Sequence, residues 1–211
     1  MSTRYVDEGY PLLHWATEIE AICPQCGGVG IIHGNPHWKD WHATFMCQKC
    51  SHSMKTKRDP WHGPVLGVGK KPCGSCGYKW VRLEKKFDDI ASVKKESTSA
   101  PCPHCNADNV VPLKFTRTEP ADHAIDPFLG LRLALIENTR HGVVWVYGAD
   151  HLDHLKRYIS AQLREGTISK WSYFSRLPTW IKAAKNREMV LKAIKKLEAR
   201  LITKGCAQTE E

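Results

Sequence analysis

The chain has 211 residues, 42% of them hydrophobic, and its 31 lysines and arginines against 22 acidic residues give a formal net charge of +9. No apolar run approaches the roughly 20 residues that span a bilayer, and the N-terminus lacks a charged region followed by an apolar stretch, so we expect neither a membrane segment nor a signal peptide. These features favour a cytoplasmic protein of one large or two small domains, with nucleic acid or an acidic molecule as partner.

Residues 1–22 form a lead-in segment in which we expect a short helix around Leu12–Ile22. Residues 23–112 then contain four Cys-x-x-Cys pairs. The pairs are Cys23/Cys26, Cys47/Cys50, Cys73/Cys76 and Cys102/Cys105. Two thiolates from one turn reach the same metal ion, and two such turns complete a tetrahedral shell of four sulfurs. The sequence therefore predicts two zinc-ribbon units that hold two structural Zn²⁺ ions per chain.

The assignment of pairs to ions has two solutions. In the sequential arrangement the first two pairs share one ion and the last two share the other, whereas an interleaved arrangement joins the first pair to the third and the second to the fourth. Shorter loops favour the sequential arrangement. Disulfides are disfavoured in a reducing compartment, and an iron–sulfur cluster remains the alternative cofactor.

The residue after each pair adds a second signal. Gly27 and Gly77 suit the positive φ that turns backbone N–H groups toward the sulfurs, and Asn106 is the next best residue for that conformation. Ser51 follows the remaining pair, which has the spacing alone.

Aromatic and basic residues accompany the first ribbon. We predict that they contact nucleic acid, because rings stack on bases and cations neutralise phosphates. The predicted contacts are Trp38, Lys39, Trp41, Lys49, Lys55, Lys57 and Arg58, followed by Lys70 and Lys71 in the second ribbon. The alternative is that the tryptophans pack against the cysteine turns as a small core.

Residues 113–205 are expected to form an α+β domain, with residues 206–211 as a tail. Strands over Leu131–Glu137 and Val143–Tyr147 predict a β-hairpin. The predicted helices run from Asp150 to Glu165, from Pro178 to Lys185 and from Asn186 to Thr203. The fold class is therefore α+β, with a double zinc-ribbon region followed by a β-hairpin and two to three helices.

The C-terminal helices are basic. Lys185, Arg187, Lys192 and Lys196 are either a solvated helix face or a further contact with the phosphate backbone, and the pattern allows both.

Catalytic motifs are not evident in the sequence. The segment Gly67-Val-Gly-Lys-Lys71 lacks the Gly and the Ser or Thr of a phosphate-binding loop, and Asp122-His123 lacks the further ligands of a metal-dependent nuclease. We therefore assign no catalytic residue and expect a protein that is not an enzyme, with a nuclease as the less favoured alternative.

The segments Gly142–Leu152 and Leu177–Arg187, after a double zinc unit, resemble a family of small bacterial zinc-ribbon proteins found on chromosomes and mobile elements. Its members are described as transcription-factor-like zinc ribbons or, loosely, as related to the replication-restart helicase. The resemblance implies a role in docking a larger assembly onto DNA.

Together these observations predict a non-catalytic zinc protein that binds DNA or RNA within a larger bacterial nucleoprotein complex. Such a complex serves defence, as a CRISPR effector does, or transposition or replication, and it implies other protein subunits as partners. The alternative is an adaptor between proteins, in which zinc only stabilises the fold.

Overall fold

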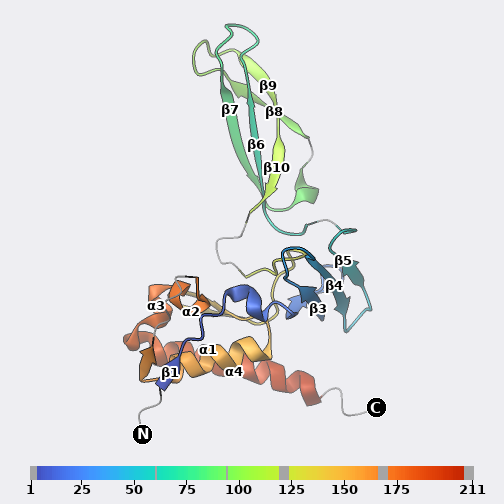
Figure 1. Cartoon of the computed structure of the whole chain (residues 1–211). Helices are drawn as coiled ribbons and strands as arrows, with labels where there is room; N and C mark the ends of the chain where they lie inside the picture. The colour runs from blue at the N-terminus through green and yellow to red at the C-terminus, as the bar shows by residue number, and fades with distance from the viewer. Residues whose placement is uncertain (1–3, 60, 94, 119–123, 166–170, 207–211) are drawn as a thin grey trace. The chain divides into compact units, whose positions relative to one another are not determined.

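A computed structural model describes residues 4–59, 61–93, 95–118, 124–165 and 171–206. The chain divides into two compact units, one formed by Met1–Arg58 with Asp126–Glu211 and the other by Asp59–Ile125 (Figure 1). The second unit is therefore inserted into the sequence of the first. Within the described residues no helix is both long and apolar enough to cross a membrane.

The first unit contains a four-stranded antiparallel sheet of order β2-β3-β4-β5. Its strands are β2 (Glu18–Ile22), β3 (Val29–Asn35), β4 (His42–Cys47) and β5 (Ser53–Lys55). The expected helix over Leu12–Ile22 is limited to a 3-10 turn, η1 (Leu12–Trp15), because residues 18–22 pair with β3. The other edge of β2 pairs with the chain near Leu133, where the Ile22 N–H donates to the Arg132 carbonyl (2.8 Å). The predicted lead-in is thus part of the sheet.

The rest of the first unit is a hairpin, a parallel strand pair and four α-helices. These elements are β1 (Arg4–Val6), β11 (Ile136–Thr139), β12 (Gly142–Trp145), α1 (Ala149–Ser160), β13 (Leu163–Glu165), α2 (Tyr173–Arg176), α3 (Thr179–Lys182), η3 (Ala184–Asn186) and α4 (Arg187–Cys206). Strands β11 and β12 pair antiparallel, and the first of them begins five residues later than expected. Of the predicted tail, Cys206 is the last residue of α4 and residues 207–211 lie outside the described part.

Helix α1 ends at Ser160 rather than at the predicted Glu165. Residues 163–165 instead form β13, which pairs in parallel with β1. The side chain of Arg164 then donates hydrogen bonds to the carbonyls of Tyr158 (3.0 Å) and Ile159 (3.2 Å), so it satisfies backbone acceptors that a helix end leaves open. Leu163 is 58% exposed as a result.

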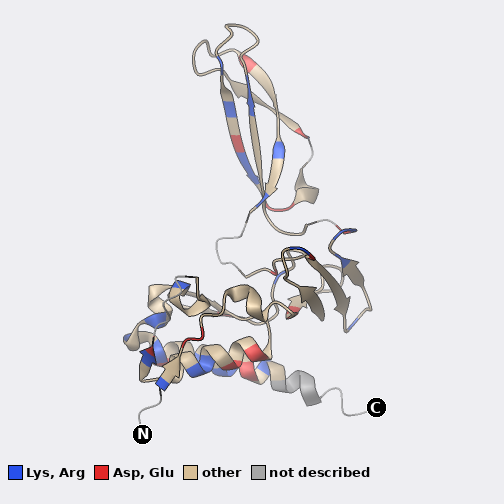
Figure 2. Ribbon diagram, viewed as in Figure 1, with Lys and Arg blue, Asp and Glu red and all other residues tan. Residues whose placement is uncertain are grey.

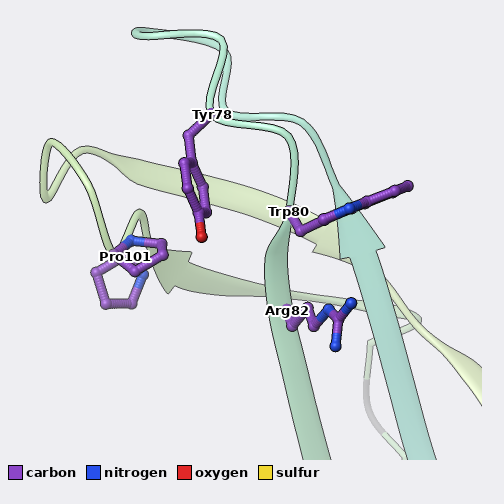
Figure 3. A pocket seen from close by; sticks show the side chains of 5 residues that line it. Tyr78, Trp80, Arg82 and Pro101 are labelled. Carbon is purple, nitrogen blue, oxygen red and sulfur yellow. The ribbon is translucent and has the colours of Figure 1, made fainter.

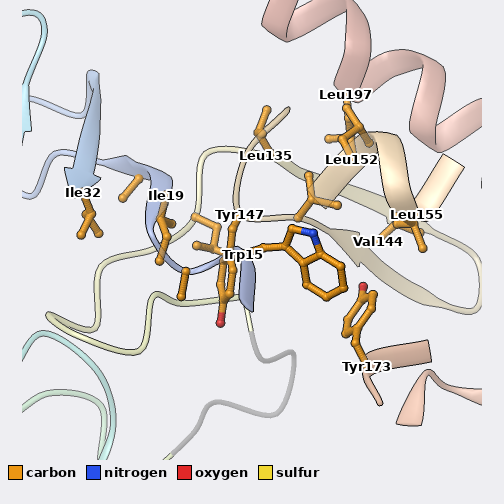
Figure 4. Close-up of a cluster of buried hydrophobic side chains, with 14 of the residues drawn as sticks. Trp15, Ile19, Ile32, Leu135, Val144, Tyr147, Leu152, Leu155, Tyr173 and Leu197 are labelled. Atoms are coloured by element: carbon orange, nitrogen blue, oxygen red, sulfur yellow. The ribbon is translucent and has the colours of Figure 1, made fainter. Parts of the chain in front are cut away.

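One apolar core joins the sheet to the helices of the first unit (Figure 4). Ile19 and Ile32 of the sheet belong to the same buried cluster as Leu135 of the hairpin region, Leu152 of α1 and Leu197 of α4. The buried residues of α4 lie at the spacing of one helix face, since Val190, Ile194 and Leu197 are fully buried.

The second unit is built almost wholly of strands. They are β6 (Val65–Lys71), β7 (Val81–Phe87), β8 (Ser97–Pro101), β9 (Asp108–Pro112) and β10 (Lys114–Arg117), with one 3-10 turn, η2 (Ile90–Ser92). Strands β10-β6-β7 form an antiparallel sheet, and β8 and β9 form a hairpin (Figure 1). Its buried cluster contains five residues, namely Cys73, Val81, Ala100, Cys102 and Val111.

The compact units do not follow the predicted domain borders. The predicted border separates residues 23–112, with both ribbons, from residues 113–205. The first ribbon instead lies in one unit with the C-terminal region, because Ile32 and Phe45 of the ribbon share a core with residues beyond 126.

Candidate metal centres and nucleic-acid interface

The eight paired cysteines form two groups, each with all four sulfurs within 4.8 Å of one another. The first group is Cys23, Cys26, Cys47 and Cys50, and the second is Cys73, Cys76, Cys102 and Cys105. This is the sequential arrangement that loop length favoured.

The sulfur separations fit a tetrahedral metal shell. The Sγ–Sγ distances across the pairs are 3.8 Å for Cys23–Cys50 and 3.6 Å for Cys26–Cys47. In the second group, Cys73–Cys105 and Cys76–Cys102 are both 3.7 Å apart. A metal–sulfur bond of about 2.3 Å gives a tetrahedron with edges of about 3.8 Å, whereas a disulfide needs about 2.05 Å. The residues present therefore fit a four-thiolate metal ion at each centre.

All four cysteine turns share one hydrogen-bond pattern. The N–H of the first cysteine donates to the carbonyl five residues later, as from Cys23 to Gly28 (2.7 Å) and from Cys73 to Tyr78 (2.8 Å). The same bond closes the other two turns. An N–H near each pair also donates to a cysteine sulfur at 3.4 Å, and the donors are Gly28, Lys49, Ser75 and His104. Such bonds orient the sulfurs and disperse thiolate charge.

The residue after each pair has a positive φ in every turn. Gly27 (69°), Gly77 (72°) and Asn106 (61°) have it, as their types predicted, and Ser51 has it too (56°). The Cys47/Cys50 turn thus takes the same conformation, although serine is less suited to a positive φ than glycine or asparagine. A Cβ at Gly27 or Gly77 would meet nothing within 4 Å, so the preference for glycine is conformational rather than steric.

Adjacent thiols of the second centre have pKa values shifted in opposite directions. The N–H groups of Cys76 and Ser75 lower the pKa of the Cys73 thiol to about 6. At Cys76 the Tyr78 N–H acts in the same direction, but the adjacent thiols, Cys105 foremost, raise the pKa to about 12. Opposite shifts in adjacent groups arise because four sulfurs this close cannot all ionise unaided, and a divalent ion removes that conflict.

Asn109, which the sequence analysis did not single out, supports the second centre. Its side chain is buried, and its Nδ2 donates to the Cys73 sulfur (3.6 Å) and to the Ala107 carbonyl (2.7 Å). Its Oδ1 accepts from the Gly74 N–H (2.9 Å). Asn109 therefore ties β9 to the cysteine turn between β6 and β7. The sequence signal for this supporting role was the position of Asn109, four residues after Cys105.

The tip of the β3–β4 hairpin displays the exposed pair predicted there. Trp38 is 78% exposed, and the Lys39 ammonium lies 5.0 Å from the centre of its ring. The loop is held in place, since Asn35 donates to the Asp40 carboxylate (3.0 Å) and accepts from the His37 N–H (3.1 Å). An aromatic face and a cation are thus presented together on a fixed turn.

Three predicted contacts have structural partners. Trp41 is half-buried, and its ring packs on Phe128 with centroids 4.6 Å apart, which is the packing alternative. Arg187 donates to the Ala161 carbonyl (3.1 Å), and Lys196 pairs with Glu137 (2.5 Å). The Lys196 ammonium, with Arg200 beyond it, lowers the pKa of that buried carboxyl.

The remaining predicted residues are scattered. Lys49, Lys55, Lys57, Arg58, Lys185 and Lys192 are exposed in the first unit, and in the second unit Lys70 is exposed and Lys71 half-buried. Lys49 lies in a cysteine turn, at the opposite end of the β3–β4 hairpin from Trp38. Lysine and arginine occur along β6, β7 and β10 and along α4 (Figure 2). Asp122 and His123 lie outside the described residues.

The second ribbon contains a hollow that the sequence analysis missed. A cavity of about 390 Å³ beside its cysteine turns is lined by Tyr78, Trp80, Arg82, Pro101 and Pro103 (Figure 3). The available signal was the alternation of Trp80 and Arg82 directly after the third cysteine pair.

No protein-family model, curated protein or solved structure matches the chain.

Proposed function

We propose that this protein is a non-catalytic, two-zinc nucleic-acid-binding protein that acts as a subunit of a larger bacterial nucleoprotein complex. The proposal rests on one observation in each ribbon, a tryptophan with lysine ammonium groups close to its ring. In the first ribbon the tryptophan lies at the tip of the β3–β4 hairpin, and in the second it follows a cysteine turn. Lys39 lies over Trp38 in the first ribbon, and Lys70 (4.9 Å) and Lys79 (5.3 Å) lie over Trp80 in the second.

Such pairs combine the two features that a polyanion with flat bases requires. The ring offers a stacking face and the ammonium neutralises a phosphate. The formal charge of +9 falls to about +5 once eight thiolates and two Zn²⁺ ions are counted, so the metal-loaded protein stays basic.

Zinc has a structural role in this proposal. Four thiolates fill the coordination shell, so the ion offers no open position for a water molecule or a substrate. The cysteine turns thereby become rigid supports for the residues beside them. The zinc-ribbon resemblance is the reason for placing this binding subunit in a defence, transposition or replication complex.

The test is a titration of labelled duplex and single-stranded oligonucleotides with the zinc-loaded protein at several salt concentrations. We expect affinity to fall steeply with salt, and Lys39→Ala and Lys70→Ala each to reduce the slope of log K against log salt by about 1. Lys156→Ala is the matched control, because that lysine pairs with Glu198 (2.7 Å) and should leave the slope unchanged. Absence of binding at low salt would overturn the proposal.

Two exposed apolar residues at the β1–β13 edge favour a second candidate, a protein–protein adaptor. Val6 of β1 and Leu163 of β13 are 59% and 58% exposed beside the ion pair of Arg4 and Glu165, a mixed surface that another protein could cover. In that case purified partner subunits would protect this edge, and no oligonucleotide would bind. The third reading, a nuclease, predicts metal-dependent cleavage of the same oligonucleotides.

A further inference from the structure

The hollow in the second ribbon opens on a face of the sheet that the unit's own core does not use. Val81 and Leu83 of β7 point toward the small core, so Trp80, Arg82 and Glu84 lie on the other face by strand alternation. Lys70 of β6 is directly opposite Arg82 in the register and therefore shares that face.

Tyr78 and Trp80 belong to the lining of the hollow near the cysteine turns. Tyr78 extends toward Pro101, while Trp80 and Arg82, which follow on the same segment, point away from Pro101 (Figure 3). Tyr78 is 42% exposed, and His104 stacks near it with parallel rings 6.0 Å apart. An exposed tyrosine and a half-buried tryptophan thus both line the hollow.

The charge around the hollow is positive. Its five lining residues include Arg82 and no acid, and the ammonium groups of Lys70 and Lys79 lie within 5.3 Å of the Trp80 ring centre. Two acids lie further out: Glu84 along the same strand face, and Asp108, the register partner of Pro101. Both lysines are exposed and flexible, so they can move from the ring to a phosphate when a base takes the ring face.

We propose that this hollow binds single-stranded nucleic acid. An unpaired base stacks on Trp80 or Tyr78, and Arg82, Lys70 and Lys79 hold the adjoining phosphates. This inference rests on the proposed function and adds the class of ligand and its site. A duplex is a poorer ligand here, because its base faces are stacked on one another and exposing one costs a few kcal/mol. Stacking tolerates any base, so the hollow distinguishes single strands from duplexes rather than one base sequence from another.

The experiment measures binding of the zinc-loaded full chain to short labelled oligonucleotides of one length. The ligands are single-stranded DNA, single-stranded RNA, duplex DNA and an abasic strand that keeps the phosphates. The variants are Trp80→Ala, Tyr78→Ala and Arg82→Ala. Trp171→Ala is the matched control, since it removes a tryptophan that is 73% exposed in the other unit. Zinc content verifies that each variant retains its fold.

We expect Trp80→Ala and Tyr78→Ala each to weaken binding of the base-bearing single strands by about tenfold, while the abasic strand already binds the wild type about tenfold more weakly. Arg82→Ala should reduce the salt slope by about 1. The control should match the wild type. The DNA and RNA strands distinguish the two sources of an unpaired base.

Two results would overturn the inference while leaving the proposed function in place. One is salt-dependent binding that neither aromatic substitution weakens, and the other is a duplex bound more tightly than the single strands. If Trp80→Ala loses zinc, Tyr78→Ala and Arg82→Ala decide the question, because their side chains are exposed. A wild-type protein that binds none of the oligonucleotides at low salt would overturn both proposals.

Discussion

The two ribbons share their cysteine turns but differ in what lies behind them. The first ribbon buries Ile32 and Phe45 in a core that extends to α1 and α4. The second has a buried cluster of five residues, two of which are the cysteines Cys73 and Cys102. A metal centre can therefore reinforce an existing core, or it can replace one.

This difference indicates how much of the folding free energy the metal must supply in each unit. Small units without a large core depend on metals or disulfides, and a structural Zn²⁺ contributes about 10–16 kcal/mol of apparent binding free energy. We expect the second unit to depend on its ion for folding, whereas the first unit keeps its helices and most of its core when the metal is removed.

The largest expected effect follows from removing the metal with a strong chelator under reducing conditions. All four α-helices of the described residues belong to the first unit, so circular dichroism at 222 nm should fall only slightly. The second unit should unfold, and trypsin should then cleave at Lys70, Lys85 and neighbouring sites. Equal resistance of both units to trypsin after chelation would contradict this difference between them.

The second effect concerns the loop that backs the first ribbon. The Asp126 carboxylate is fully buried and accepts N–H bonds from Phe128 (2.8 Å), Leu129 (2.7 Å) and Leu131 (2.5 Å). Burial raises its pKa, and these donors oppose the shift. Asp126→Ala leaves three buried donors unpaired and should lower the unfolding free energy of the first unit by about 3–4 kcal/mol.

Asp126→Asn is the matched variant. Its amide oxygen can still accept from Phe128 and Leu129, but its NH₂ group cannot accept from Leu131, so we expect about half of that loss. Urea titrations followed at 222 nm provide the measurement. An Asp126→Ala protein as stable as the wild type would show that this loop does not support the ribbon.

One buried histidine should make the stability of the first unit depend on pH. His151 is fully buried and stacks on Trp15 with centroids 4.7 Å apart, while its Nδ1 accepts from the Tyr147 N–H (3.2 Å). Burial, with a smaller contribution from His154, lowers its pKa to about 3. The unfolded chain therefore binds a proton near pH 6.5 that the folded chain does not.

The stability from this depressed pKa is complete above about pH 6.5 and is lost as pH falls below it. Between pH 7 and pH 5.5 the loss should be about 1.3 kcal/mol. His151→Phe should remove this part of the slope, as measured by urea titration at both pH values. Identical slopes in the two proteins would contradict the assignment.

The smallest effects come from the residue after each cysteine pair. Gly77→Ala places a Cβ at a positive φ and should destabilise the second unit by about 1 kcal/mol, whereas Ser51→Gly relieves the same strain and should stabilise the first unit by about 0.5 kcal/mol. Zinc-competition titrations measure both changes. A stabilising Gly77→Ala would contradict the conformational argument.

The sequence predicted the parts of the fold that depend on local chemistry. The cysteine spacing identified both thiol clusters, and the residue types at 27, 77 and 106 anticipated their backbone conformation. The apolar spacing also predicted helix α4. Each cysteine turn and the helix depend on residues close together along the chain, and the metal-ligand chemistry of the turns implied that they pair.

The remainder depended on contacts between distant segments. Residues 18–22 form a strand because β3 pairs with them, and α1 ends early because β1 pairs with residues 163–165. Trp41 faces Phe128 rather than solvent, and Lys196 faces Glu137, although composition alone made both suitable for nucleic acid. The hollow beside Trp80 likewise includes Pro101 of β8, and the residue spacing does not predict that β8 lies there.

The most direct test of the account is the zinc content of the purified protein, measured together with that of Cys47→Ser and Cys102→Ser. We predict two zinc ions per wild-type chain and one in each variant, because each substitution breaks one four-thiolate shell. A wild-type chain with fewer than two zinc ions, or variants that keep both, would contradict the account.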